Sequence, residues 1–117
     1  MTPAHDPLQP AFRALADPTR RQILMDLAAS DRSIAEVAAR FTMTRVAVRK
    51  HMTVLEEGGL IAIHSEGRER IAALRPAELK SAHDWICAFS RFWDDRLAAL
   101  KDAVEREETR DERRDDD

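Results

Sequence analysis

The sequence has few of the residues from which covalent frameworks and catalytic loops are built. Its 117 residues include one cysteine, three glycines and no tyrosine. A single thiol, Cys87, excludes an internal disulfide and is typical of proteins in a reducing compartment. So few glycines leave no glycine-rich loop for a phosphate, and no nucleophile lies near a general base in the sequence. We therefore expect no enzymatic activity.

Long apolar segments are also lacking. No uninterrupted apolar run approaches the roughly 18 residues that a membrane-spanning helix needs. No apolar stretch follows the N-terminus, where Thr2, Pro3, His5, Asp6 and Pro7 are polar or helix-breaking, so a secretory signal is not expected. We expect a soluble, cytoplasmic protein with no membrane partner.

The net charge of −3 is distributed unevenly along the chain. Residues 105–117 contain eight acidic side chains and four arginines. Residues 40–54, in contrast, contain Arg40, Arg45, Arg49 and Lys50 and no acidic residue. A local basic segment of this kind is what contact with nucleic-acid phosphates requires. The overall pI of 5.8 therefore does not exclude a DNA partner.

Hydrophobic spacing and capping residues predict a mainly α fold with a small β-hairpin. Asp17, Ser33 and Thr44 are expected to cap helices, Ser33 in a capping box with Glu36. Helices are predicted at 8–16, 18–29, 33–41, 44–57 and from Pro76 to 104, with strands at 60–65 and 69–74 around a turn at Gly67. We expect one domain at 8–104 between a flexible N-terminus, 1–7, and a charged C-terminal tail, 105–117, that is solvated or disordered.

The pair Gly58-Gly59 follows the fourth predicted helix and is expected to end it by supplying the left-handed backbone conformation that a C-terminal cap needs. The third and fourth helices, joined by a short turn, form a predicted helix-turn-helix. The N-terminal residues of the second helix in such a motif reach base edges in the major groove, and a basic hairpin beside it serves as a wing. Val46 and Ala47 are suited to thymine methyl groups. The predicted DNA-binding residues are Thr42, Thr44, Arg45, Val46, Ala47, Arg49, Lys50, His51, Arg68 and Arg70.

The last predicted helix carries an apolar seam and four aromatic side chains. Its apolar residues recur every three or four positions, which is typical of helix packing. Core or dimer packing is the leading interpretation of this pattern, and an apolar effector pocket between subunits is the alternative. The seam residues are Leu79, Ala82, Ile86, Phe89, Trp93, Leu97, Leu100 and Val104.

Three segments carry a resemblance to a known family. They are residues 12–24 (FRALADPTRRQIL), the predicted helix 33–41, and residues 48–61 (VRKHMTVLEEGGLI), followed by the hairpin. Over residues 8–104 the chain resembles the ArsR (arsenic-repressor) family of winged helix-turn-helix regulators. The resemblance implies a homodimeric repressor, joined through its first and last helices, that binds an inverted-repeat operator and often controls its own promoter. The interface residues expected on this basis are Leu8, Phe12, Leu15, Leu79, Ile86, Phe89, Trp93, Leu97 and Leu100.

The metal sites of that family do not match this sequence. Members that sense arsenic or cadmium have a cysteine pair at the start of the third helix, where residues 32–36 have none. Members that sense zinc use aspartates and histidines along the last helix, where this chain has His83 beside Asp84. We expect no metal and no cofactor, with a zinc site that uses His5, His83 and glutamates as the alternative. Cys87 is expected to be a small buried hydrophobic residue.

Two further functions are kept as alternatives to a plain DNA-binding repressor. One is a winged-helix module that binds another protein, which would favour apolar residues at the positions of Arg45, Arg49 and Lys50. The other is a sensor that responds to a metal or to an unidentified small-molecule effector.

Overall fold

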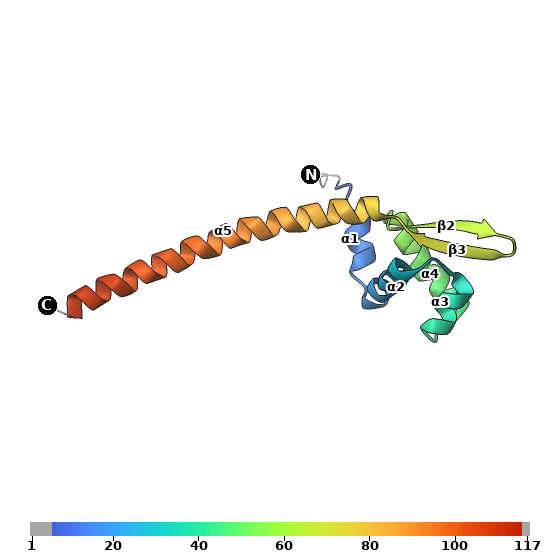
Figure 1. Cartoon of the computed structure of the whole chain (residues 1–117), viewed down its shortest axis with the longest axis horizontal. Helices are drawn as coiled ribbons and strands as arrows, with labels where there is room; N and C mark the ends of the chain where they lie inside the picture. Colours follow the sequence, from blue (N-terminus) through green and yellow to red (C-terminus); the bar gives the residue numbers. More distant parts are fainter. Residues whose placement is uncertain (1–5, 116–117) are drawn as a thin grey trace, which may run out of the picture. The chain divides into compact units, whose positions relative to one another are not determined.

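The computed structural model describes residues 6–115 as five helices and three strands (Figure 1). The elements are α1 (Gln9–Leu15), α2 (Pro18–Ala29), β1 (Arg32–Ser33), α3 (Ile34–Arg40), α4 (Arg45–Glu57), β2 (Ile61–Glu66), β3 (Glu69–Leu74) and α5 (Pro76–Asp115). The helices and the hairpin that the sequence predicts are confirmed. The chain divides into two compact units, of which the first ends at Ala82 and the second begins at His83.

The predicted N-caps start α2, α3 and α4. The Asp17 carboxylate accepts a hydrogen bond from the Arg20 amide at 3.0 Å, and this bond lowers the pKa of Asp17. At α3 the Ser33 hydroxyl accepts from the Glu36 amide at 3.1 Å, and the Glu36 carboxylate accepts from the Ser33 amide at 3.2 Å. The Thr44 side chain caps α4 in the same way as Asp17 caps α2. Each cap satisfies amides that the first helical turn leaves unpaired.

The sheet has one more strand than predicted. Its order is β1-β3-β2, and β1 pairs antiparallel with β3 through Arg32 opposite Ala72 and Ser33 opposite Ile71. The hairpin is therefore part of a three-stranded sheet, and the predicted two-stranded arrangement was incomplete. A strand of two residues is too short to show the alternation of apolar and polar residues that marks a strand in a sequence. As a result, β1 looks like a break between α2 and α3 in the sequence.

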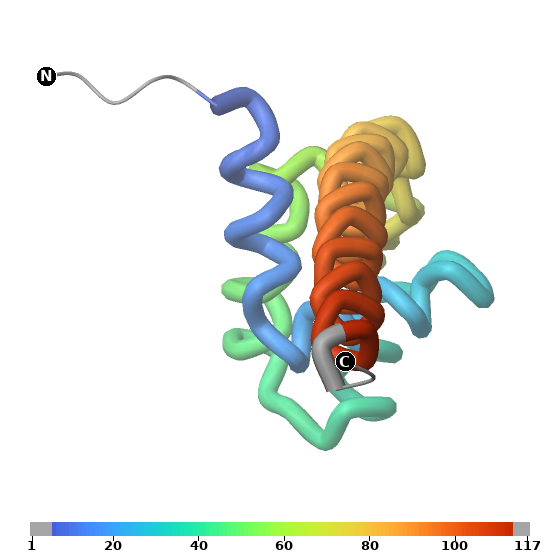
Figure 2. The backbone as a smooth tube through the Cα atoms, turned by 90° about the vertical axis from the view of Figure 1, so that its left-hand side faces the viewer, coloured from blue at the N-terminus to red at the C-terminus, as the bar shows by residue number. Residues whose placement is uncertain are grey.

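The two glycines after α4 do different work. Gly59 adopts a left-handed conformation with φ of 72°, as predicted, whereas Gly58 has φ of −74° and does not. A Cβ atom at Gly58 would lie 2.9 Å from the Pro10 carbonyl oxygen. Gly58 therefore allows α1 to lie close against the end of α4 (Figure 2). The left-handed conformation expected of this pair is thus supplied by Gly59 alone.

The core of the first unit is formed by one face of each helix and by the inner face of the sheet. In α4 this face consists of Val48, Met52 and Leu55, each at most 1% exposed. Leu60 and Ile61 add the first residues of the hairpin to the same cluster. Burial of the α4 stripe fixes which side of α4 faces outward.

Helix α5 continues past the predicted end of the domain at residue 104. It reaches Asp115, and the side chains of residues 105–113 are exposed, so this part of the predicted tail is helical. Residues 1–5, which make up most of the predicted flexible N-terminus, lie outside the described residues. Within residues 6–115, no helix combines the length and the apolar character needed to cross a lipid bilayer.

The turn between α3 and α4 contains a strained residue. Thr42 has φ of 52°, a conformation that β-branched residues rarely adopt. Asparagine tolerates this conformation better, so we expect Thr42→Asn to raise the free energy of unfolding by about 0.5–1 kcal/mol. Denaturant unfolding monitored by circular dichroism measures the change. Thr53→Asn, inside α4, is the control, and stabilisation of both variants would contradict strain at Thr42.

Candidate DNA-binding interface

Helix α4 presents its first two turns to solvent on the side opposite the core stripe. Thr44, Arg45, Val46, Arg49 and Lys50 are all exposed. Two other predicted contact residues, at positions 47 and 51, are half-buried. The exposed face contains no acidic residue until positions 56 and 57. Its N-terminal half is therefore the part that suits a polyanion.

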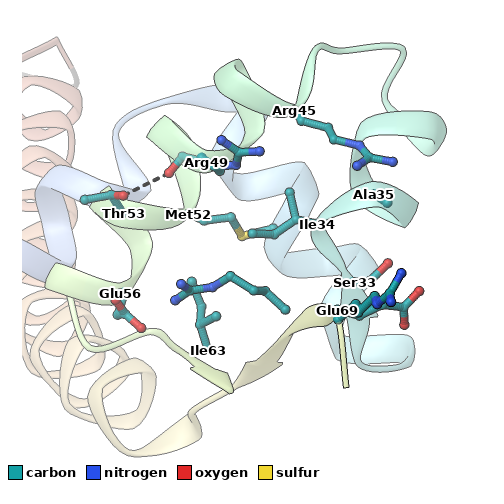
Figure 3. A pocket seen from close by; sticks show the side chains of 12 residues that line it. Ser33, Ile34, Ala35, Arg45, Arg49, Met52, Thr53, Glu56, Ile63 and Glu69 are labelled. Carbon is teal, nitrogen blue, oxygen red and sulfur yellow. Dashed lines mark hydrogen bonds between the residues drawn. The ribbon is translucent and has the colours of Figure 1, made fainter. Parts of the chain in front are cut away.

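A cavity of about 550 Å³ lies between α4, the start of α3 and the hairpin (Figure 3). Four predicted DNA-binding residues line it, Arg45 and Arg49 from α4 and Arg68 and Arg70 from the hairpin. Apolar side chains including Met52 also line it, together with two acidic residues at positions 56 and 69. The structure thus brings to one site two basic groups that are about 20 residues apart in the sequence. Within residues 6–115, no ion pair or side-chain hydrogen bond engages any of these four guanidinium groups.

Other arginines of the first unit are used by the fold. Arg20 donates through Nε to the Ala14 carbonyl at 2.8 Å and through Nη2 to the Arg13 carbonyl at 3.0 Å. Arg21 donates to the Leu15 carbonyl at 2.7 Å. These carbonyls belong to the last turn of α1, where α-helical amide partners run out, and the Arg13 carbonyl also accepts from the Ala16 amide at 3.2 Å. The two arginines at the start of α2 therefore hold α1 in place.

Arg40, counted in the basic segment of the sequence, is also taken up by the fold. Its Nη2 lies 2.7 Å from Oδ1 of Asp26 on α2, and its Nε donates to both carboxylate oxygens at 2.9 Å. Arg32 of β1 approaches the same carboxylate, with Nε 3.4 Å from Oδ2. The hydrogen bond from Arg40 lowers the pKa of Asp26. This pairing removes Arg40 from the free cations, so the basic surface is smaller than the sequence suggests. The sequence did not predict the pairing, because the two residues are 14 positions apart and no local pattern connects them.

His51 has a neighbour inside the protein. Its Nδ1 lies 3.5 Å from Nη1 of Arg20, and its side chain is half-buried. Thr44 likewise uses its hydroxyl oxygen to accept the Ala47 amide at 3.1 Å. Both side chains hold α4 in position, and direct contact of either with DNA stays a prediction.

The predicted dimer residues fall into two groups. Leu15 and Leu79 are partly buried against the core of the first unit, and Leu8 and Phe12 are also half-buried. The five from the second unit are exposed in the single chain. Their exposed fractions are 51% for Ile86, 46% for Phe89, 48% for Trp93, 57% for Leu97 and 60% for Leu100.

The aromatic side chains of α5 form a continuous cluster. The ring centroids of Trp85 and Phe89 are 5.3 Å apart in a stacked arrangement, and Phe89 meets Trp93 edge-on at 5.9 Å. The Arg96 guanidinium lies 4.9 Å from the centroid of Phe92. A contiguous solvent-exposed apolar surface commonly marks an interaction site.

Cys87 is half-buried, so the prediction of a buried hydrophobic residue was wrong. Its Sγ lies 3.4 Å from Nε2 of His83, one helical turn earlier. His83 in turn has Nδ1 3.5 Å from the Asp84 carboxylate. Among residues 6–115, no group of three or more histidine, cysteine or acidic side chains is arranged to hold a metal ion. His5, the other histidine of the alternative zinc site, lies outside the described residues.

Comparison with known proteins places these features in a family. A helix-turn-helix domain family matches residues 15–64. HTH-type transcriptional regulator Rv2034 of Mycobacterium tuberculosis is 31% identical over 97 residues, which cover 83% of this chain and 88% of the relative. Transcriptional repressor SdpR of Bacillus subtilis is 28% identical over 86 residues, which cover 74% of this chain and 96% of the relative.

Solved structures with a similar fold carry similar descriptions. An ArsR-like transcriptional regulator from Rhodococcus sp. RHA1 has a TM-score of 0.74 and 35% identity, and the match covers 85% of this chain and 91% of that one. A homodimeric winged helix-turn-helix DNA-binding domain of Mycobacterium bovis shares the fold, with a TM-score of 0.61 and 20% identity over 78% of this chain and 91% of that one. The chain belongs to the ArsR family of winged helix-turn-helix transcriptional regulators.

Proposed function

We propose that this regulator is a repressor that binds an inverted-repeat operator as a homodimer, including one in its own promoter. The observation that carries the proposal is the group of five exposed cations without protein partners among residues 6–115. They are Arg45, Arg49 and Lys50 on α4 and Arg68 and Arg70 on the hairpin. The α4 residues enter the major groove, and the hairpin residues contact the adjacent backbone.

The homodimer rests on α5. Six apolar side chains of the predicted seam are about half exposed in the single chain, and a second copy would remove them from water. A symmetric dimer presents two α4 helices to two half-sites, which accounts for an inverted repeat. SdpR carries the name of a repressor, which supports repression as the outcome of binding here.

Removal of α4 cations tests the interface. Arg49→Ala and Lys50→Ala should each weaken binding to the promoter region about tenfold at low salt, because each removes a phosphate or base contact from both half-sites. Binding of the labelled upstream region is followed by fluorescence anisotropy at two salt concentrations. The slope of log affinity against log salt should become shallower in both variants.

Arg75→Ala provides the matched control. Arg75 is an exposed arginine of the first unit that does not line the cavity, so its loss should leave affinity almost unchanged. Equal losses in all three variants would mean that only overall charge matters. If the wild-type protein bound neither any part of the upstream region nor any duplex of a random-sequence library, the proposed function would be overturned. A protein partner would then be favoured.

A further inference from the structure

We propose that Val46 reads the C5-methyl group of a pyrimidine in each half-site of the operator. The inference rests on the proposed function and adds to it the chemical group that is recognised. It starts from an apolar side chain that is not part of the hydrophobic core. Val46 is 58% exposed, whereas Val48 on the same helix is completely buried.

The position of Val46 on α4 directs it away from the core. It lies two residues before Val48, which on an α-helix is about 200° around the axis. Its neighbours one turn later are Arg49 and Lys50, two of the cations without protein partners. Val46 is therefore in the middle of the surface that meets DNA, with the charged groups that hold the phosphates beside it.

Local stability does not explain a valine at this position. A β-branched residue is a poorer helix former than alanine, and an exposed valine gains no burial in return. The other apolar residue in the first turn, Ala47, is half-buried, and its amide is bound by the Thr44 hydroxyl. The structure therefore selects Val46 from the two residues that the sequence suggested for methyl contacts.

The major groove offers one apolar group that suits this side chain. Thymine presents its C5-methyl group there, next to polar base edges that the arginines can bind. A cytosine that carries a C5-methyl group presents the same surface. Both sources share one chemistry, and the position of the methyl group in the half-site is the same for either.

The test removes the methyl group from the DNA and shortens the Val46 side chain of the protein. The operator is first defined by footprinting or by selection from random duplexes, and each thymine of a half-site and its symmetry mate is then replaced by deoxyuridine, which lacks only the methyl group. For the wild-type protein, deoxyuridine at one such pair of positions should weaken binding. The expected loss is about fourfold for each half-site, which corresponds to the burial of one methyl group. Val46→Ala should bind the unmodified duplex about as weakly as the wild type binds the uridine duplex, and it should lose nothing more on the uridine duplex.

The cytosine arm separates the two sources. If the contacted base is a cytosine, 5-methylcytosine at that position should strengthen wild-type binding and leave Val46→Ala unchanged. Met25→Ala, which removes another exposed apolar side chain of the same unit, should keep the full response of the wild type. Circular dichroism confirms that each variant is folded.

The outcomes are distinct from those that bear on DNA binding itself. Val46→Ala that responds to the methyl group as strongly as the wild type would overturn the proposal, as would a wild-type protein that is indifferent to methyl groups at every position. In both cases the operator would still be bound, so the proposed function would stand. Coupling between Val46 and a single methyl position would establish the contact.

Discussion

Trp93→Ala combined with Leu97→Ala is expected to convert the dimer into a monomer. The two side chains are one turn apart on α5 and about half exposed in the single chain. Their removal deletes an aromatic and an aliphatic anchor from the centre of the seam, where such residues dominate interface energy. Sedimentation velocity at micromolar concentration should show one species of about 13.3 kDa.

Loss of the dimer should weaken DNA binding without any change in α4. A monomer contacts one half-site at a time, so affinity for the complete operator should fall by about a hundredfold, while affinity for an isolated half-site is retained. Asp94→Ala together with Asp95→Ala, on the same stretch of α5 but outside the seam, is the control. A dimeric mass for the Trp93 and Leu97 variant would show that the seam lies elsewhere, for example on α1 alone.

The second large effect is expected at Asp26. Its side chain is 10% exposed and holds Arg32 and Arg40, which belong to β1 and α3. Asp26→Ala leaves both guanidinium groups without their anion and frees α2 from the two elements. Loss of one partner from a fully buried ion pair costs about 3–5 kcal/mol. Because Arg40 is 51% exposed and water can replace part of the interaction, we expect a loss of about 2 kcal/mol here.

The effect of Asp26 should depend on pH in a defined direction. The Arg40 hydrogen bond lowers the pKa of Asp26 in the folded protein, whereas the unfolded value is about 3.9. The ionised carboxylate therefore stabilises the fold above about pH 4, and this contribution is lost as the pH falls through the lowered pKa. The difference in unfolding free energy between the wild type and Asp26→Ala should be constant from about pH 5 to 8 and shrink in acid.

Asp31→Ala is the matched control for this titration. Asp31 is an exposed acid close to Asp26 in the sequence, and among residues 6–115 its carboxylate makes no ion pair. Its loss should change stability by less than about 0.5 kcal/mol at any pH. A difference for Asp26→Ala that persists at full size in strong acid would mean that packing, rather than charge, holds this corner of the fold.

The sequence predicted most of the helices because their signals are local. Ser33 with Glu36, and Asp17 before Pro18, specify helix starts within four residues, and the Val48, Met52 and Leu55 spacing specifies a buried face. The same periodicity showed which side of α4 faces outward. Most of the candidate DNA contacts on α4 followed from this spacing of buried residues. Their role in DNA binding stays a prediction.

The features that were missed depend on residues far apart in the chain. The pairing of Arg40 with Asp26 spans 14 residues, and that of β1 with β3 spans about 40. The close approach of Pro10 to Gly58 spans almost half the chain. Spacing within a single element contains no information on such contacts. This is why Arg40 was counted among the free cations and the tight contact at Gly58 was not predicted.

Ser33 ends β1 and caps α3, so one residue belongs both to the sheet and to the helix-turn-helix. The middle of β3 is therefore paired on both sides, with β2 and with β1, whose last residue caps α3. The conformational entropy of ordering β3 is lost when the protein folds and not when it meets DNA. Changes that separate Ser33 from Ile71 should thus weaken DNA binding, because β3 would then have to be ordered when the complex forms, although both side chains are buried.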